Sequence, residues 1–136
     1  MSVRIITDSG SDILPGEHED LVVLPLSIMF GTTTYADGAD LSHERFYELL
    51  VEEDDLPKTG QVNPYAFSQA FEEAYEAGDE VVCITLSSKL SGTYQSALTA
   101  ASEAKVVVRV VDSLNVCVGE LVLVEYALRL VATGKS

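Results

Sequence analysis

One stretch of the sequence constrains the fold more than any other: residues 80–104, EVVCITLSSKLSGTYQSALTAASEA. Its apolar start, residues 81–84, has the length and the β-branched composition of a buried strand. A turn of serine, glycine and threonine follows, and an alanine-rich segment then carries apolar residues at helical spacing. This order leaves free backbone N–H groups at the start of the helix, where phosphates and carboxylates bind. The stretch therefore predicts either an anion site or, more simply, a helix capped by Ser91.

The rest of the chain predicts further strands and helices. Strands are expected at residues 3–6, in two pieces of residues 21–30 divided by Pro25, and at residues 106–111. Helices are expected at residues 42–51, 65–77 and 116–132, with a β-rich turn at 31–38 and a loop at 58–62. Because strands and helices alternate in the second half, the strands should be parallel and joined by right-handed helical crossovers. The predicted fold is α/β: a three-layer α/β/α sandwich with a mainly parallel sheet.

Composition narrows the possible functions. A chain of 136 residues, of which 47% are hydrophobic, can form one domain with a buried core. The net charge of −14 argues against binding to nucleic acid or to an anionic membrane surface, so local donors must hold any anionic ligand. The N-terminus does not resemble a signal peptide, and we expect a cytoplasmic protein. Cys83 and Cys117 lie in apolar strings, and both are expected to be buried free thiols.

The sequence gives little support for catalysis. Asp8 and Asp12 have no obvious third oxygen ligand, so no metal site is expected. His18 and His43 have no nucleophile beside them and are expected at the surface. Ser91 lacks the G-x-S-x-G context of a hydrolase, and no phosphate-binding glycine motif is present. A phosphate- or nucleotide-binding domain, a small hydrolase and a fragment without any ligand remain as alternative hypotheses.

Four polar loops follow an apolar strand or precede a helix: residues 7–12, 58–61, 87–93 and 112–115. Each loop alone is a weak signal. In an open sheet of parallel strands, however, ligands bind beyond the carboxyl ends of the strands. The four loops are therefore expected to meet at one edge of the sheet and to form one site.

The same strings resemble the DegV family of bacterial fatty-acid-binding proteins. The resemblance spans the whole chain, and its most specific part is SKLSGTYQSA at residues 88–97. The other strings that carry it are TDSGSD (7–12), YAD (35–37), KTGQVNP (58–64), DS (112–113) and GKS (134–136). They occur in the order and at the spacing that the family shows.

The resemblance implies that the protein binds one long-chain fatty acid and has no catalytic residue, metal or other cofactor. Thr59 and Ser91 would donate hydrogen bonds to the carboxylate, and Gly92 and Thr93 would let the backbone approach it. The residues around these ligands would be Asp8, Ser9, Gly60, Asp112 and Ser113. A separate ATP-dependent fatty acid kinase subunit would then convert the bound acid into its acyl phosphate.

The chain also departs from the family pattern. Gly10 stands where the family usually has Thr, Gly60 where it has Ser, and Val62 where it has Pro. Family members are considerably longer, with a second domain that covers the acyl tail and adds a histidine near the carboxylate. Residues 1–136 correspond to the N-terminal α/β domain, and the second domain is expected to be absent. Apolar surface should therefore be exposed, and self-association through it is expected.

Overall fold

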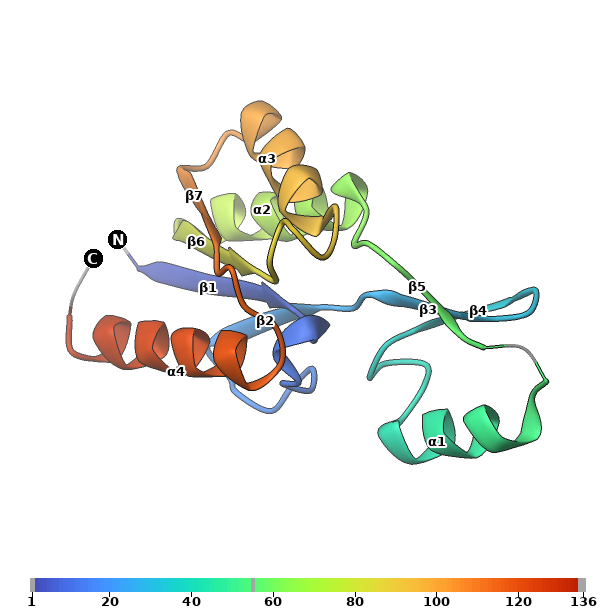
Figure 1. The fold of residues 1–136 in the computed structure, drawn as a ribbon. Coiled ribbons are helices and arrows are strands. Elements are labelled where there is room, and N and C mark those ends of the chain that lie inside the picture. Colours follow the sequence, from blue (N-terminus) through green and yellow to red (C-terminus); the bar gives the residue numbers. More distant parts are fainter. Residues whose placement is uncertain (1, 55, 135–136) are drawn as a thin grey trace.

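The body of the protein is a four-stranded parallel sheet (Figure 1). The computed structural model describes residues 2–54 and 56–134. The strand order is β2-β1-β6-β7, with the bounds Leu21–Leu24, Val3–Asp8, Glu80–Thr85 and Val108–Asp112 respectively. The two central strands, β1 and β6, bury most of their side chains, because helices cover both faces of the sheet.

Three helices complete the sandwich. α2 (Pro64–Ala77) and α3 (Thr93–Glu103) pack on one face, around a core that includes Phe67 and Phe71. α4 (Val118–Ala132) lies alone on the other face, where Val124 packs against the β1 and β2 side of the sheet (Figure 1). The predicted three-layer α/β/α sandwich with parallel strands is confirmed.

Local sequence explains where α2 begins and ends. The Asn63 side chain accepts a hydrogen bond from the Ala66 N–H, and Pro64 occupies the first turn, where its missing N–H has no consequence. Gly78 ends the helix in the left-handed conformation, at φ 79°. α3 begins differently, because its N-cap is Gly92, which has no side chain to cap the helix.

A second, smaller sheet projects from the body as an arm (Figure 1). Its strands β3 (Ser27–Phe30), β4 (Thr33–Ala36) and β5 (Lys58–Gly60) are antiparallel, in the order β4-β3-β5. α1 (His43–Glu52) connects β4 to β5 along the chain and packs on this sheet through a small core of its own. That core contains Ile28, Phe30, Leu41 and Leu49.

The arm is the main feature that the sequence did not predict. Pro25 divides residues 21–30 as expected, but the second piece, β3, leaves the parallel sheet. Residues 58–60 form a strand and not a loop, because they pair with β3 through contacts that are distant in sequence. Only Cys83 is buried; the prediction for Cys117 is wrong, because this residue lies in the exposed loop before α4.

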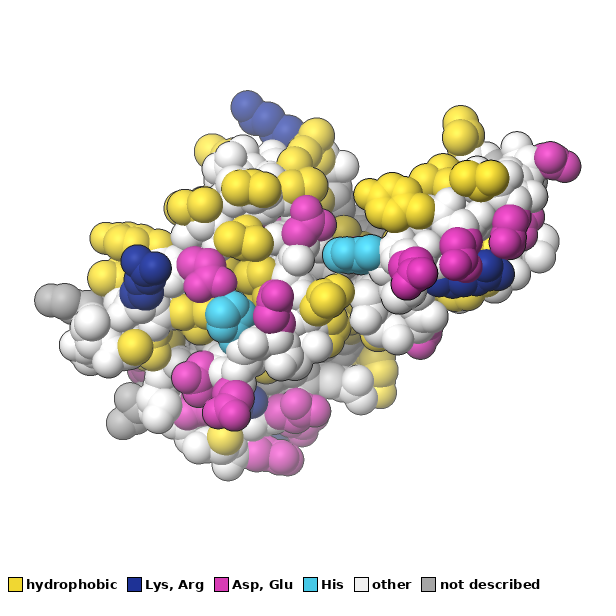
Figure 2. Space-filling model, turned by 90° about the horizontal axis from the view of Figure 1, so that it is seen from below, with side chains coloured by type: hydrophobic (Ala, Val, Ile, Leu, Met, Phe, Trp, Pro, Cys, Tyr) yellow, Lys and Arg dark blue, Asp and Glu magenta, His cyan; other side chains and the backbone are white. Residues whose placement is uncertain are grey.

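Hydrophobic side chains remain exposed on the outer side of α4. Val118, Val122 and Tyr126 follow one another at four-residue spacing, and each is more than half exposed. Figure 2 shows yellow patches on this side of the body, interrupted by acidic side chains. Within residues 2–54 and 56–134, no helix is long and apolar enough to cross a membrane.

Candidate functional site

Three of the four polar loops meet at the carboxyl edge of the parallel sheet. β1 ends at Asp8 and continues into a short 3-10 helix, η1 (Ser9–Ser11). β6 continues into the loop that precedes α3, and β7 ends at Asp112 before the loop that leads to α4. The Ser87 N–H donates to the Asn115 carbonyl oxygen and so joins the last two loops.

Three of the predicted carboxylate ligands lie in the loop between β6 and α3. They form a compact turn, which we call the Ser91 turn (Ser91, Gly92 and Thr93). The Oγ of Ser91 accepts a hydrogen bond from the Thr93 N–H at 3.2 Å and lies 2.9 Å from Oγ1 of Thr93. Ser91 and Gly92 are half-buried, whereas Thr93 is fully buried. Ser91 thus accepts one first-turn N–H of α3, as a capping residue would, but it precedes the N-cap position.

The hydroxyl groups of the Ser91 turn leave one proton available. Oγ1 of Thr93 accepts from the Val62 N–H at 3.2 Å, so its own proton can point to Ser91. In that arrangement Ser91 accepts twice, from the N–H and from the hydroxyl of Thr93, and its own O–H is free. The turn can therefore donate to an anion that approaches the half-buried Ser91.

The arm brings Thr59 toward this turn. Besides the Val62 contact, Nε2 of Gln61 donates to Oγ of Ser96 in α3 at 3.0 Å. Oε1 of Gln61 lies directly over Gly92, where the Cβ of any larger residue would overlap it. Thr59 precedes Gln61 by two residues, about 7 Å of extended chain, and its side chain is exposed. The contacts of residues 61 and 62 thus hold the end of the arm against α3, two and three residues along the chain from the exposed Thr59.

The other predicted side chains have structural partners. The Ser9 Oγ accepts from the Leu26 N–H at 2.9 Å and so ties η1 to the start of the arm. Gly60 lies against the Ser27 side chain, with no room for a Cβ between them. Asp112 accepts from the Ser88 and Leu114 N–H groups, both at 3.1 Å. Burial raises the pKa of its half-buried carboxyl, but the bond from the Ser88 side chain and these two backbone bonds outweigh it and lower the pKa.

Ser113 and Asp8 are likewise fixed by the backbone. The Ser113 Oγ donates to the Asn115 carbonyl oxygen and accepts from the Asn115 N–H, both at 3.1 Å. The buried Asp8 accepts through Oδ1 from the Gly10 N–H at 2.9 Å and through Oδ2 from the Leu86 N–H at 2.8 Å. Asp8 therefore joins the end of β1 to the end of β6.

Sequence reasoning missed Glu120, which lies beside Asp8. It belongs to the first turn of α4 and is fully buried. Its Oε1 lies 3.1 Å from Oγ1 of Thr7, whose single proton is also directed at the Ile84 carbonyl oxygen, 2.8 Å away. An acidic residue is common in the first turn of a helix, because it complements the helix dipole. The sequence therefore gave no reason to expect that Glu120 is buried. Its place near the start of an apolar helix was the only available signal.

Burial raises the pKa of both carboxyls in this pair. For Glu120 the largest cause is burial, followed by the charge of Asp8 and a hydrogen bond to it. For Asp8 burial raises the pKa more than the hydrogen bonds from Leu86, Glu120 and Gly10 lower it. The helix dipole favours ionised Glu120 by only about 0.3–1 kcal/mol, less than one pKa unit, so burial prevails. Burial therefore favours the protonated form of Glu120.

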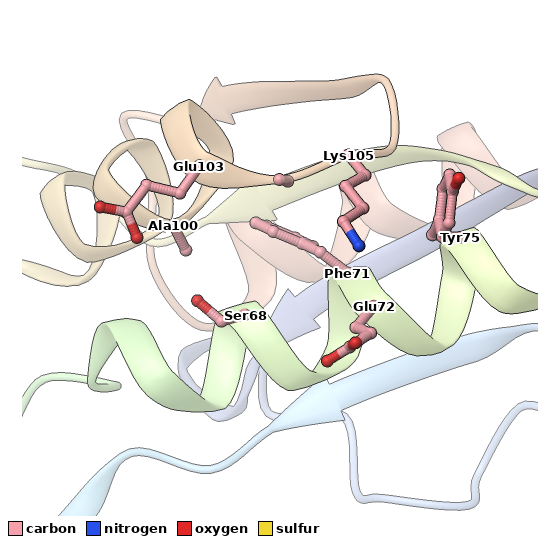
Figure 3. A pocket seen from close by; sticks show the side chains of 8 residues that line it. Ser68, Phe71, Glu72, Tyr75, Ala100, Glu103 and Lys105 are labelled. Carbon is pink, nitrogen blue, oxygen red and sulfur yellow. The ribbon is translucent and has the colours of Figure 1, made fainter.

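Two cavities lie elsewhere. One, of about 240 Å³, opens between α2 and α3, with Phe71 and Ala100 among its lining and Lys105 at its rim (Figure 3). Lys105 follows α3, whereas the Ser91 turn precedes it, so the two features lie at opposite ends of the helix. The other cavity, of about 800 Å³, lies between α4 and the amino ends of β1 and β2. Neither is lined by a predicted carboxylate ligand.

The site holds no general base for a serine nucleophile. Among the described residues, the only side chain that bonds to the Ser91 hydroxyl is that of Thr93. His18 binds Glu125 of α4 at 2.8 Å, and His43 begins α1 in the arm. No group of three or more metal-binding side chains occurs within the residues the structure describes.

Comparison with known proteins agrees with this architecture. Residues 2–136 match the family model described as "Uncharacterised protein, DegV family". A DegV domain-containing protein of Clostridium acetobutylicum is 41% identical over 139 residues, which cover 98% of this chain and 49% of the relative. The chain thus spans about half the length of the curated relatives it matches.

Solved structures show the same fold. A Thermus thermophilus structure described as "Fatty Acid Binding of a DegV family Protein" has a TM-score of 0.89 at 32% identity. A stearic acid-binding protein from Eubacterium ventriosum has the same TM-score and identity. Each match covers 100% of this chain and 49% of the solved chain. With a four-stranded parallel sheet, an antiparallel arm and a family match over nearly its whole length, this chain belongs to the DegV family.

Proposed function

We propose that this chain binds a long-chain fatty acid and holds its carboxylate at the Ser91 turn. The observation that carries the proposal is the half-buried Ser91 hydroxyl at the start of α3, which can donate to an anion when Thr93 donates to it. Gln61, two residues after Thr59, is bonded to α3. Solved relatives with 32% identity over all of this chain are described as binding fatty acids, one of them stearic acid. The proposal assigns the carboxylate to Thr59, Ser91, Gly92 and Thr93.

Local donors are sufficient for this carboxylate. Hydrogen bonds to an ionised oxygen contribute about 1.5–3 kcal/mol each, so two hydroxyls and an N–H group can offset much of the cost of desolvation. Lys58 and Lys89 are exposed and lie within two residues of Thr59 and Ser91. They add a positive local field to a chain whose net charge is −14. The carboxylate would thus be oriented without a buried lysine.

The acyl tail would supply most of the affinity. Each buried methylene contributes about 0.8 kcal/mol, so a long chain needs an extended apolar cover. The relatives are about twice as long as this chain, and we propose that a second domain supplies this cover and also buries the exposed side chains of α4. Without it, those side chains would favour self-association.

The proposal assigns no bond-making step to this chain. Ser91 has no base beside it, so a separate ATP-dependent kinase would phosphorylate the bound carboxylate. The half-buried position of Ser91 supports this assignment, because a partner can reach a head group held at the sheet edge. Loss of acyl phosphate formation on removal of this chain from a kinase assay would support the partnership.

Native mass spectrometry of the chain purified from bacteria, followed by solvent extraction, tests the ligand class. We expect a co-purified adduct with the mass of a long-chain fatty acid. If the protein is free of ligand, titration with stearate should restore the adduct. Failure to bind stearate at millimolar concentration would contradict the proposal for this chain.

Substitution tests the residues. Ser91→Ala and Thr59→Ala should each weaken stearate binding by about 1–2 kcal/mol, with little change in the free energy of unfolding. Ser102→Ala and Thr99→Ala are matched controls, because both hydroxyls lie near the other end of α3 and bond only to local carbonyl oxygens. Unchanged affinity in the Ser91–Thr59 double variant would refute the carboxylate assignment.

A further inference from the structure

The carboxyl pair formed by Asp8 and Glu120 has one oxygen without a donor. Oε2 of Glu120 is buried and has no hydrogen-bond partner other than the neighbouring carboxyl among the described residues. If both groups were ionised, two buried charges would face each other and this oxygen would be unsatisfied. A proton on Glu120, donated to Asp8, removes both problems at once.

Gly10 shows how closely the two groups approach. A Cβ at this position would lie 2.8 Å from Oδ1 of Asp8 and 3.2 Å from Oε2 of Glu120. Both oxygens therefore lie over the same glycine, on the side where a larger residue would carry its side chain. A side chain at position 10 would therefore crowd both carboxyls.

The pair connects three segments of the sheet edge. Asp8 binds the Gly10 N–H of η1 and the Leu86 N–H at the end of β6. Glu120 comes from α4, whose start is also held to η1 by the Cys117 N–H donating to the Gly10 carbonyl oxygen at 2.7 Å. Leu86 leads directly into Ser87, whose carbonyl oxygen accepts from the Ser91 N–H at 3.2 Å. The carboxyl pair is thus two short steps from the Ser91 turn.

We propose that Glu120 carries a proton that it donates to Asp8, and that this shared proton fixes the Ser91 turn for ligand binding. Glu120 is then a positioning residue, because it acts on the ligand only through Asp8, Leu86 and the turn. This role rests on the proposed function, but the existence of the proton does not.

The surroundings of the carboxyl pair favour a single proton. The other titratable groups that face it are Asp12, Cys83 and Cys117, and none of them is a cation. Burial, followed by Asp8 and Glu120, raises the pKa of the Cys83 thiol, so that thiol stays neutral. Loss of the shared proton would leave two repelling carboxylates between η1 and α4. The end of β6, and with it the Ser91 turn, would then shift.

Carboxyl carbon NMR on the full chain tests the proton directly. The side-chain carboxyl resonance of Glu120, assigned by its loss in Glu120→Gln, should remain that of a protonated acid through neutral pH. Amide resonances of Leu86 and Ser91 should move with the same midpoint in the wild type and remain unchanged in Glu120→Gln, whose amide donates permanently. Titration of Glu120 at an ordinary glutamate pKa would overturn the proposal. Amide resonances of Leu86 and Ser91 that do not change at the midpoint of the Glu120 titration would overturn it as well.

Stearate binding supplies the functional readout. The wild-type affinity should fall by about tenfold as pH rises through that midpoint, whereas the affinity of Glu120→Gln should not. Equal pH profiles for the two proteins would overturn the positioning role. If neither protein binds stearate at neutral pH, the proposed function fails, and the NMR midpoints alone decide whether Glu120 shares its proton with Asp8 and fixes the turn.

Discussion

The Ser91 turn and the carboxyl pair lie at the same edge of the parallel sheet, but only the first is open to a ligand. Ser91 and Gly92 are half-buried, and the Ser91 hydroxyl has a proton to donate. Asp8 and Glu120 are fully buried. Backbone N–H groups donate to both oxygens of Asp8, and Oε2 of Glu120 has no partner other than Asp8 among the described residues. Polar side chains at a strand end thus have two different roles here: one cluster can receive an anion, and the other holds the loops in place.

Because the Ser91 turn is open and the carboxyl pair is buried, substitutions in the two clusters should have different effects. A change in the carboxyl pair should alter the free energy of unfolding, because it disturbs buried charge. A change in the Ser91 turn should alter ligand affinity and leave the stability nearly constant. Only loss of the proton on Glu120 should change both quantities, because it would also shift the Ser91 turn.

The largest expected effect is on the pH dependence of stability. The pKa of Glu120 is raised from 4.5 to about 9, so between these values the folded chain binds more protons than the unfolded chain. Its contribution is complete below pH 4.5 and is lost as pH rises toward 9, at up to about 1.4 kcal/mol per pH unit. Urea unfolding of Glu120→Gln should show a flatter profile than the wild type from pH 6 to 9. Parallel profiles would mean that Glu120 titrates normally.

A second prediction concerns Gly10, whose missing side chain makes room for the carboxyl pair. Gly10→Val should lower the free energy of unfolding by about 1–3 kcal/mol, because the new side chain overlaps both acids. Gly10→Ala should cost less. The same valine in a Glu120→Ala background should cost less as well, since one of the two overlapping groups is gone. Denaturant unfolding of the wild type, the two Gly10 variants, Glu120→Ala and the double variant measures these costs. A harmless Gly10→Val would contradict the close approach.

Gly10 also illustrates what could be predicted from the sequence. The alternation of strands and helices predicted the parallel sheet, because that pattern is local and regular. The Ser91 turn was found for the same reason, as all its residues lie in one short string. Glu120 was missed because its partner Asp8 is 112 positions away in the sequence, so only the fold brings them together. Gly10 was noted as a departure from the family pattern, and its reason emerged only with Glu120.

The arm was missed on similar grounds. Residues 58–60 carry no strand signal of their own and become β5 only by pairing with β3. That pairing matters for the candidate site, because it determines where Thr59 lies relative to α3. The loop interpretation of residues 58–60 was wrong, and the structure shows that pairing with β3 holds them in place.

Gly92 offers a test confined to the open cluster. Gly92→Ala would place a Cβ on Oε1 of Gln61 and displace that side chain from the start of α3. Stearate affinity should fall by about 1–1.5 kcal/mol, comparable to the loss of one hydrogen bond. The pH profile of stability should remain that of the wild type, because Asp8 and Glu120 are untouched. Isothermal titration with stearate measures the affinity, and urea unfolding measures the stability. A loss of stability without a loss of affinity would mean that Gly92 has a structural role and does not contribute to ligand binding.

The smallest expected effect comes from the contact between the arm and α3. Gln61→Ala and Ser96→Ala each remove the 3.0 Å hydrogen bond that helps to hold residues 58–62 against the helix. If this bond positions Thr59, the two substitutions should weaken stearate binding non-additively, with a coupling of about 0.5 kcal/mol. In a Thr59→Ala background either substitution should have almost no further effect, because the hydroxyl that the contact positions is absent. Additive losses in both backgrounds would mean that Gln61 acts on the ligand by itself and that the arm does not position Thr59 through it.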